Sequence, residues 1–419
     1  MKPSARLQAV VELLDEFQSS NLPLDILSGN YFRKRRFIGS GDRRAVKETL
    51  YGLMRQYISL GWVLGNAGLE ATPRWLLLAY LSETGGLEDE LFAGDKYGLP
   101  ALSDEESKGL EKLDMAGAPA WARLNCPEWL AEKFKEHFGD GLEQELEALN
   151  QRAPLCLRVN TLKTSVEKAA PVLEGKGFIK TKLAAKGFSS PENIPLHDLP
   201  GFQDGHYEVQ DEGSQLAASL VGAEPGQQVL DLCAGAGGKT LAMAADMQNK
   251  GQVFAYDTDE RRLTALQKRI QKAGVRNVQV IAKDDLKGLT GKMAKKMDRV
   301  LLDVPCSGTG TWRRSPDSRI RLTPEKLEGY LKTQAELLDQ GAGYVKPGGK
   351  MAYVSCSLLS EENEDQVSAF LGRHKGWQLL KIDGDFENNA TGLEGTLQLT
   401  PARHGTDGFF VAILHNAVT

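Results

Sequence analysis

Two cysteines stand in short loops that follow predicted strands, and their type and context suit covalent chemistry. One is Cys306, in Asp303-Val304-Pro305-Cys306-Ser307-Gly308-Thr309-Gly310, and the other is Cys356, in Ser355-Cys356-Ser357. A thiolate is a strong nucleophile, and a second group beside it can help to end a covalent step. Free cysteine is also a common small core residue. Two of them at consecutive strand ends favour catalysis over packing, whereas Cys126 and Cys156 are expected to be structural.

A glycine-rich loop upstream of both cysteines is expected to bind a nucleoside. It reads Asp231-Leu232-Cys233-Ala234-Gly235-Ala236-Gly237-Gly238-Lys239-Thr240 and opens a predicted helix. A phosphate-binding P-loop requires glycine where Cys233 stands, so that interpretation fails. A dinucleotide loop requires glycine where Thr240 stands, which weakens it. The Asp-x-x-x-Gly-x-Gly loop of S-adenosylmethionine (SAM) enzymes fits, because its glycines let the backbone approach the ligand.

Two carboxylates at the ends of the following strands extend this prediction. Asp257 is placed to accept hydrogen bonds from ribose hydroxyls, which fits NAD and SAM equally. Asp284 closes the third strand, where a carboxylate near an adenine amino group favours SAM. Taken singly, each is as readily a solvated strand end. Together with the glycine loop they favour a cofactor site.

Two thiols beside a methyl donor point to a pyrimidine substrate. Cytosine C5 is not nucleophilic, but a thiolate that adds to C6 makes C5 enamine-like and able to attack a sulfonium methyl. The C5 proton must then leave, so release needs a second group. Ser360 is predicted to cap a helix with Glu361 and Glu362 in its first turn, and the dipole of that helix would favour a thiolate at Cys356.

The elements that must position these residues form an α/β pattern. Short apolar strands alternate with helices, which predicts a doubly wound, mostly parallel sheet with its ligand beyond the carboxyl ends of the strands. In the strand order of SAM enzymes the strands before the two cysteines are neighbours, about 5 Å apart. The predicted strands are residues 228–232, 252–256, 278–281, 299–303, 350–354, 377–382 and 408–414.

The 419 residues suggest more than one domain. Apolar residues recur at helical spacing over residues 7–81, and residues 129–149 resemble one amphipathic helix. A small α+β module follows, with a predicted strand at 178–186. Residues 82–114 are acidic and are expected to form a solvated connector or a loosely packed helical face.

A net charge of −5 argues against a uniformly basic surface but conceals a basic segment. Residues 30–56 hold eight basic and two acidic residues, including Arg33, Lys34, Arg35 and Arg36. These side chains could hold RNA phosphates, with Tyr31, Phe32 and Phe37 stacking on bases, although a solvated helix end is the simpler alternative. A second basic stretch, residues 313–321, offers further cations for phosphates.

The chain resembles the RNA 5-methylcytosine methyltransferases of the RsmB/Sun family. The resemblance covers most of residues 120–419. It lies in the SAM loop, in Asp303–Gly310, and in further motifs: Pro154-Leu155-Cys156-Leu157-Arg158-Val159-Asn160, Tyr207-Glu208-Val209-Gln210-Asp211-Glu212, Trp312-Arg313-Arg314-Ser315-Pro316-Asp317, and residues 353–364 with Glu362-Asn363-Glu364. Two departures are Gly235-Ala236 where many members have Ala-Pro, and Ser355 where they have Thr.

The resemblance implies a role for each site residue. Cys356 would be the nucleophile, Cys306 would assist product release, and Asp303 would contact the N3/N4 edge of the cytosine. The implied SAM site is Cys233, Ala234, Gly235, Ala236, Gly237, Gly238, Lys239, Asp257, Asp284 and Asp303. The implied RNA contacts are Arg158 and Asn160 in an RRM-like module; Arg313 and Arg314 are added from the second basic stretch.

We therefore expect a class I SAM-dependent methyltransferase fold, a doubly wound, mostly parallel seven-stranded sheet, at residues 206–419. It would follow a helical, loosely NusB-like RNA-binding domain (1–118) and a linking helix with the RRM-like module (119–205). The expected activity is methylation of cytosine C5 in structured RNA, ribosomal in preference to transfer RNA. A non-catalytic RNA-binding assembly factor and an NAD-dependent oxidoreductase are the alternatives. A cytoplasmic, monomeric protein without a metal or a membrane span is expected, since no leader or apolar span is seen.

Overall fold

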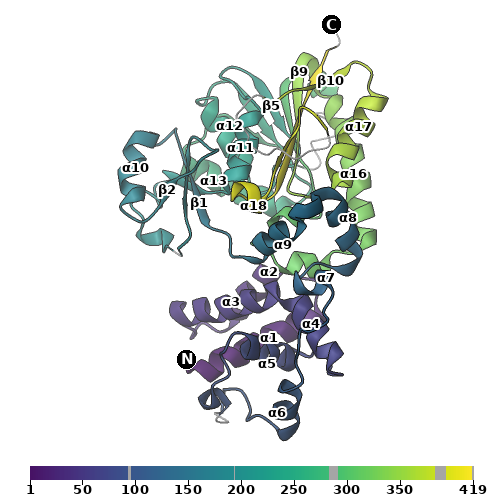
Figure 1. Ribbon diagram of the computed structural model, residues 1–419. Coiled ribbons are helices and arrows are strands. Elements are labelled where there is room, and N and C mark those ends of the chain that lie inside the picture. Colours follow the sequence, from purple (N-terminus) through teal and green to yellow (C-terminus); the bar gives the residue numbers. More distant parts are fainter. Residues whose placement is uncertain (93–95, 193, 283–290, 383–392, 418–419) are drawn as a thin grey trace. The chain divides into compact units, whose positions relative to one another are not determined.

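The computed structural model describes residues 1–92, 96–192, 194–282, 291–382 and 393–417 (Figure 1). These residues form two compact units, Met1–Arg152 with Trp312–Leu322, and Ala153–Thr311 with Thr323–Thr419. The linking helices therefore group with the N-terminal unit, and the small α+β module groups with the methyltransferase-like sheet. This division differs from the predicted boundaries at 118 and 205.

The first unit is helical, as the apolar spacing predicts. The expected helix over residues 129–149 is broken at Gly139, whose φ of 52° is left-handed. The helices are α1 (Pro3–Ser19), α2 (Leu24–Lys34), α3 (Ser40–Arg55), α4 (Tyr57–Asn66), α5 (Pro73–Glu83), α6 (Asp104–Leu110), α7 (Ala120–Arg123), α8 (Glu128–Phe138), α9 (Leu142–Asn150) and α15 (Asp317–Arg321), with the 3-10 turns η1 (Asp89–Phe92) and η2 (Gly139–Gly141).

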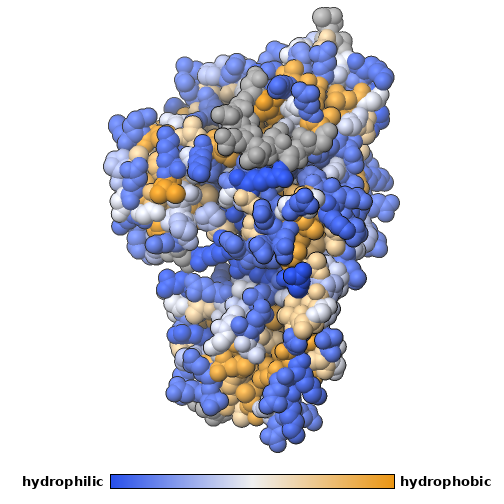
Figure 2. All heavy atoms as spheres, in the orientation of Figure 1, coloured by the Kyte–Doolittle hydropathy of each residue, from blue (hydrophilic) through white to orange (hydrophobic). Residues whose placement is uncertain are grey.

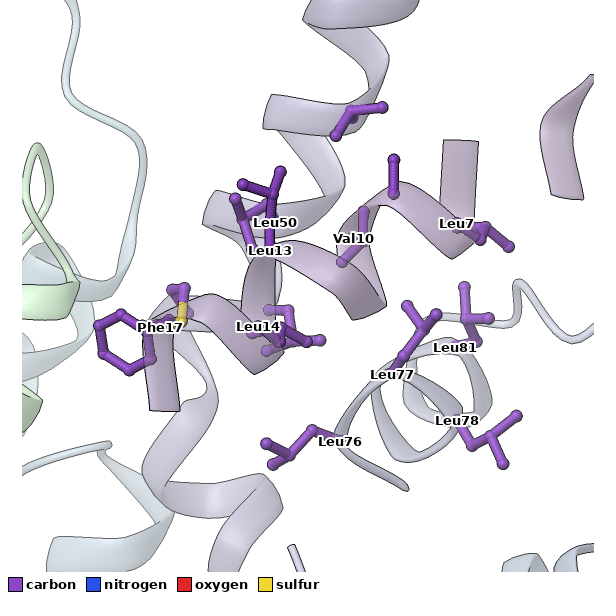
Figure 3. Close-up of a cluster of buried hydrophobic side chains, with 14 of the residues drawn as sticks. Leu7, Val10, Leu13, Leu14, Phe17, Leu50, Leu76, Leu77, Leu78 and Leu81 are labelled. Atoms are coloured by element: carbon purple, nitrogen blue, oxygen red, sulfur yellow. The ribbon is translucent and has the colours of Figure 1, made fainter. Parts of the chain in front are cut away.

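The core of this unit lies between α1, α3 and α5. Figure 3 shows Leu13 of α1 beside Leu50 of α3, with Leu77 and Leu81 of α5 pointing toward α1. Phe92 and Leu99 of the acidic segment are buried in the same core, at 6% and 1% exposed. The segment is therefore a packed part of the unit, and the solvated-connector interpretation is wrong.

Residues 312–322 belong to the first unit although they follow the loop that carries Cys306. Trp312 is fully buried and packs edge-on against Phe134, with 5.5 Å between ring centroids. Arg319 is 1% exposed and donates to the carbonyl of Asn125 at 2.9 Å. The backbone N–H of Leu24 donates to Asp317 at 3.0 Å. This segment is anchored by burial, so Arg319 is not available for phosphates.

The α+β module is a four-stranded antiparallel sheet in the order β2-β3-β1-β4. Its strands are β1 (Leu155–Val159), β2 (Ile179–Lys180), β3 (Gly187–Ser190) and β4 (Tyr207–Val209), with helix α10 (Val166–Glu174) between β1 and β2 and the 3-10 turn η3 (Leu196–Asp198) between β3 and β4. The predicted strand over residues 178–186 is wrong, because β2 and β3 lie on either side of most of it.

The large sheet has the order β10-β12-β9-β8-β5-β6-β7, with β11 paired to β12. The strands β9, β8, β5, β6 and β7 pair in parallel, and β12 is antiparallel to β9 and β10. The strands are β5 (Gln228–Asp231), β6 (Gln252–Ala255), β7 (Val278–Val280), β8 (Met297–Asp303), β9 (Val345–Ser355), β10 (Trp377–Leu380), β11 (Leu397–Leu399) and β12 (Phe409–Asn416). The predicted doubly wound sheet is confirmed.

Helices cover both faces of this sheet. One buried cluster packs α11, α12 and α13 on it, and another packs α16 and α17 on the opposite face (Figure 1). The helices are α11 (Glu212–Leu220), α12 (Gly238–Asp246), α13 (Glu260–Ala273), α16 (Pro324–Ala342), α17 (Glu364–Arg373) and α18 (Pro401–His404). Strand order reverses at β5, between β6 and β8, so a crevice is expected at the carboxyl end of β5.

Candidate active site

The two catalytic candidates lie in contact. β8 and β9 pair in parallel with Asp303 opposite Val354, so both strands end at the same edge of the sheet. The loops beyond them bring the sulfurs of Cys306 and Cys356 to 3.3 Å from each other. Their hydrogen bond and burial raise the pKa of the Cys306 thiol well above its usual value. Cys126 and Cys156 are 0% and 3% exposed, consistent with a structural role.

A glycine contact holds the Cys306 loop against β12. The N–H of Gly310 donates to the carbonyl of Cys356 at 3.0 Å, and the N–H of Gly408 donates to the carbonyl of Gly310 at 2.8 Å. A Cβ at Gly310 would lie 2.5 Å from the carbonyl oxygen of Gly408. Only glycine allows this approach, so the close contact fixes the loop that carries Cys306.

The glycine-rich loop adopts backbone conformations that suit glycine. Gly235 and Gly237 have φ of 55° and 86°, and a Cβ at Gly237 would lie 2.1 Å from Cδ1 of Leu266. A Cβ at Gly235 would meet no atom within 4 Å, so the backbone there faces open space. Asp257, 7% exposed, accepts the N–H of Gly235 at 2.8 Å. A bare loop beside open space and a carboxylate fits SAM.

The other residues of the predicted cofactor site have mixed surroundings. Burial raises the pKa of the Cys233 thiol well above 9.0, which suits a packing residue. The carbonyl of Ala236 accepts from Arg269 at 2.7 Å, so α13 holds the position where many relatives carry proline. Asp284 lies outside the described residues.

Lys239 joins the cofactor loop to the catalytic loop. Its ammonium lies 2.7 Å from the carboxylate of Asp303 and 5.0 Å from the ring centroid of Phe409, and the residue is 7% exposed. The sequence placed Lys239 among the cofactor residues without indicating this ion pair. The ion pair holds the side chain of Asp303 in place between the cofactor loop and the loop that carries Cys306.

The helix-dipole explanation for a thiolate at Cys356 is wrong. Residues Ser360–Glu362 form the 3-10 turn η5, and α17 begins only at Glu364. The dipole of a helix acts within its first turn. Glu362 is fully buried, so it does not serve as a solvated first-turn carboxylate.

The predicted RNA contacts of the α+β module are also wrong. Asn160 is 4% exposed, its Nδ2 donates to the carbonyls of Gly205 and Ala273 at 2.8 and 2.9 Å, and its Oδ1 accepts the N–H of Leu162 at 3.1 Å. Arg158 is 5% exposed, and burial lowers its pKa to about 10. Asn160 joins the module to α13 of the large sheet domain.

In the first unit, some of the predicted stacking and phosphate-binding residues are engaged elsewhere. Tyr31 and Phe32 are 3% and 4% exposed and belong to the core, whereas Phe37 is 80% exposed. Arg35 lies 3.7 Å from the ring centroid of Tyr31 and pairs with Glu12 at 3.0 Å. Only Phe37 of the three aromatic residues is free to stack on a base.

Five of the other cations of this region line one hollow. It has a volume of about 450 Å³ and lies on α2 and α3, where Figure 2 shows hydrophilic side chains. No carboxylate lines it within the described residues. Its lining is Gly29, Phe32, Arg33, Arg36, Arg43, Arg44 and Lys47. Lys34 is exposed outside this lining, and Arg313, at 6% exposed, is buried, while Arg314 is half-buried.

The described part of the chain has no helix long and apolar enough to cross a membrane. Nor do three or more histidines, cysteines, aspartates or glutamates gather as possible metal ligands among the described residues.

Known proteins match this chain over most of its length. A family model described as 16S rRNA methyltransferase RsmB/F matches residues 218–415, and one described as a ferredoxin-like domain of RsmF/B-like methyltransferases matches residues 126–188. A probable ribosomal RNA small subunit methyltransferase B of Synechocystis sp. is 34% identical over 412 residues, which cover 90% of this chain and 92% of that protein.

Solved structures show the same fold. The crystal structure of PH0851 is 26% identical, with a TM-score of 0.79 over 99% of both chains. A methyltransferase homologue from Pyrococcus horikoshii is 31% identical, with a TM-score of 0.62 over 71% of this chain and 97% of its own. The residues that the methyltransferase family model matches, 218–415, include the glycine loop and both cysteine loops. The chain therefore belongs to the RsmB/F family and is a SAM-dependent RNA methyltransferase.

Proposed function

We propose that this enzyme methylates C5 of a cytosine in 16S-type ribosomal RNA through a covalent adduct between Cys356 and C6. The observation that carries the proposal is the 3.3 Å contact between the sulfurs of Cys306 and Cys356 at the ends of neighbouring strands. Methylation of an exocyclic amine or a ribose hydroxyl needs no thiol, whereas C5 of cytosine needs a nucleophile at C6. The relatives' names support ribosomal RNA as the substrate.

The residues take different parts in this reaction. The thiolate of Cys356 adds to C6, and the electron pair of the C5–C6 double bond becomes available at C5. Bound SAM supplies an electrophilic methyl group. Asp303 accepts a hydrogen bond from the N4 amino group or from a protonated N3, and its ion pair with Lys239 holds the carboxylate in place.

Release reverses the addition. The C5 proton is removed, the double bond re-forms, and the sulfur of Cys356 leaves C6. Cys306 lies at hydrogen-bond distance from that sulfur, which supports a role for it in proton transfer and elimination. The glycine loop of Cys233–Lys239 and Asp257 would hold the cofactor, and Asp284 is retained as a candidate for its adenine.

The first unit supports the choice of RNA. Arg33 and Arg36 lie in a hollow with three further cations from α3, which suits a run of phosphates. Phe37, the residue after Arg36, is exposed. Lys34 and the partly exposed Arg314 remain weaker candidates. The protein would act as a cytoplasmic monomer.

Bisulfite sequencing of RNA from a strain that lacks the gene tests the proposal. We expect one 16S cytosine to lose its protection from conversion, and the purified enzyme with SAM to restore it. Loss of protection in a transfer RNA would instead identify a transfer RNA methyltransferase. Unchanged methylation in every RNA, with impaired assembly of the small subunit, would support a non-catalytic factor and overturn the proposal.

A further inference from the structure

Glu362 is a fully buried carboxylate next to the active site, and the proposed reaction does not use it. Its Oε1 accepts the backbone N–H of Ser307 at 2.8 Å and Nε2 of Gln334 at 3.0 Å, and its Oε2 accepts the hydroxyl of Ser307. Among the described residues its partners are neutral donors and not cations. Burying a charge without a counter-ion is costly, and the three hydrogen-bond donors that converge on this carboxylate offset part of that cost.

These donors belong to the neighbours of Cys306. Ser307 follows Cys306 directly. Gln334 of α16 donates through the same Nε2 to the carbonyl of Pro305 at 3.0 Å, and Pro305 precedes Cys306. Glu362 and Gln334 therefore hold the chain on both sides of one thiol.

Asn363, the next residue, holds the neighbours of the other thiol. Its Oδ1 accepts the hydroxyl of Ser355 at 2.5 Å, and its Nδ2 donates to the carbonyl of Ser357 at 3.0 Å. Ser355 and Ser357 flank Cys356. Two consecutive side chains thus hold the two cysteine loops: Glu362 contacts the loop of Cys306, and Asn363 contacts the loop of Cys356.

The hydroxyls of the two loops also touch each other. The hydroxyl oxygen of Ser357 lies 3.2 Å from that of Ser307 and 3.2 Å from that of Thr309. Thr309 also accepts the N–H of Leu358 at 2.8 Å. This buried network is continuous from Glu362 to Asn363, so a change at either residue is expected to alter the contact between the sulfurs.

The side chains of Glu362 and Asn363 differ in charge. Asn363 is neutral, whereas Glu362 places a negative charge beside the loop of Cys306. A second negative charge on Cys306 is disfavoured there, and the charge of Glu362 contributes to the raised pKa of that thiol. The surroundings of the two sulfurs are therefore unequal even though the sulfurs are in contact.

We propose that Glu362 and Asn363 are positioning residues that set the contact between the two thiols, and that the charge of Glu362 keeps the shared proton on Cys306. Cys306 then donates its S–H to Cys356, which carries the negative charge of the pair. One proton and one negative charge are distributed over two sulfurs, and no bond to either sulfur changes. The catalytic consequence rests on the proposed cytosine methylation, but the assignment of the proton does not.

The first test measures the two thiols separately. Full-length wild type, Glu362→Gln and the control Glu361→Gln are alkylated with iodoacetamide across a pH series, and each cysteine is quantified by peptide mass spectrometry. In wild type we expect Cys356 to react at lower pH than Cys306. In Glu362→Gln the midpoint for Cys306 should fall by at least one pH unit, while Glu361→Gln behaves as wild type. A midpoint within 0.2 unit of wild type in a folded Glu362→Gln protein would overturn the proposal.

The second test measures positioning without removing the charge. Gln334→Met keeps the volume of this buried side chain but removes its donations to Pro305 and Glu362. We expect Cys356 still to react first, while the turnover number for methyl transfer falls at least tenfold and KM for SAM stays within twofold. Wild-type turnover would overturn the positioning role, and this variant tests that role even if Glu362→Gln does not fold.

The two proposals can fail separately. The alkylation order needs neither RNA nor SAM, so the expected order in an enzyme that methylates no cytosine would count against the proposed function alone. Cytosine methylation by wild type with identical alkylation profiles in wild type and Glu362→Gln would count against the role of Glu362 alone.

Discussion

The ammonium of Lys239 lies 2.7 Å from the carboxylate of Asp303, and this ion pair joins the glycine loop after β5 to the cysteine loop after β8. Lys239 is 7% exposed and the side chain of Asp303 is 33% exposed, so the pair is partly buried and is screened less than a surface ion pair. A change in the cofactor loop is thereby coupled to the carboxylate that is proposed to orient the base.

Replacing Lys239 by methionine removes the cation and keeps the aliphatic stem. We expect methyl transfer to fall at least a hundredfold, because Asp303 loses the charge that holds its carboxylate. SAM affinity, measured by calorimetry, should change less than tenfold. Lys250→Met, at an exposed lysine after the same helix, is the matched control. Equal losses in both variants would show that the effect is general and not due to the ion pair.

Substitutions of the two cysteines should impair different steps of the reaction. Cys356→Ala removes the proposed nucleophile and should abolish both transfer and any covalent RNA adduct. Cys306→Ala should allow addition and methylation but slow release, so that a protein–RNA adduct accumulates on a denaturing gel. Retained turnover in Cys356→Ala would reject the assignment of the nucleophile. A gel of Cys306→Ala without a slow band would reject the release role.

The hollow on α2 and α3 should govern RNA affinity through charge. Reversing Arg36 and Arg44 to glutamate should weaken binding of a 16S fragment at least tenfold in 0.15 M salt. It should also lower the slope of log affinity against log salt by about 2, since each lost phosphate contact lowers the slope by about 1. Lys108→Glu with Lys112→Glu, exposed in the acidic segment of the same unit, is the control. A slope that changes equally in both pairs would contradict a specific phosphate site.

Asp231 should make stability depend on pH. Burial raises its pKa from 3.8 to about 7, although the hydroxyl of Thr240 donates to it at 2.6 Å and favours the carboxylate. The folded pKa is above the unfolded one, so the folded state binds the proton more tightly, and stability falls as pH rises from about 4 through 7. Between pH 5 and 8, the free energy of unfolding of wild type should drop by about 2 to 3 kcal/mol relative to Asp231→Asn.

Urea unfolding of both proteins at the two pH values measures this difference. Asp204→Asn, an exposed aspartate of the same unit, provides the comparison for a general charge effect. Parallel pH profiles for wild type and Asp231→Asn would show that Asp231 ionises in the folded state as it does in the unfolded chain.

The sequence predicted that Cys306 and Cys356 follow neighbouring strands, because parallel strands end at one edge of a sheet. The contact between their sulfurs is visible only in the structure. Strand β11 was not predicted, since three residues are too few to show alternation. Arg158 and Asn160 were assigned to RNA from their residue type and motif. Their burial depends instead on how the small sheet packs on helices α11–α13, which cover the large sheet. Periodicity within either sheet carries no information on that packing.

The position of Glu362 could not be predicted from the sequence for a different reason. Its position after Ser360 and Glu361 predicts the first turn of a helix. The chain instead makes a 3-10 turn, which points Glu362 at a loop more than fifty residues earlier in the sequence. No local pattern predicts Gln334 as its partner, because a single glutamine on an amphipathic helix reads as an ordinary polar residue.

Residues 312–322 give the protein a topology in which neither unit is encoded by one uninterrupted stretch. A polypeptide that ends at Arg152 would lack Trp312, leaving the edge of Phe134 uncovered, and would lack the carboxylate of Asp317 that accepts the N–H of Leu24. The helical unit therefore cannot be cut from the gene, exchanged or duplicated as a simple N-terminal module. Recombination that separates residues 1–152 from residues 312–322 would leave the helical unit without part of its core, so these two stretches are constrained to be inherited together.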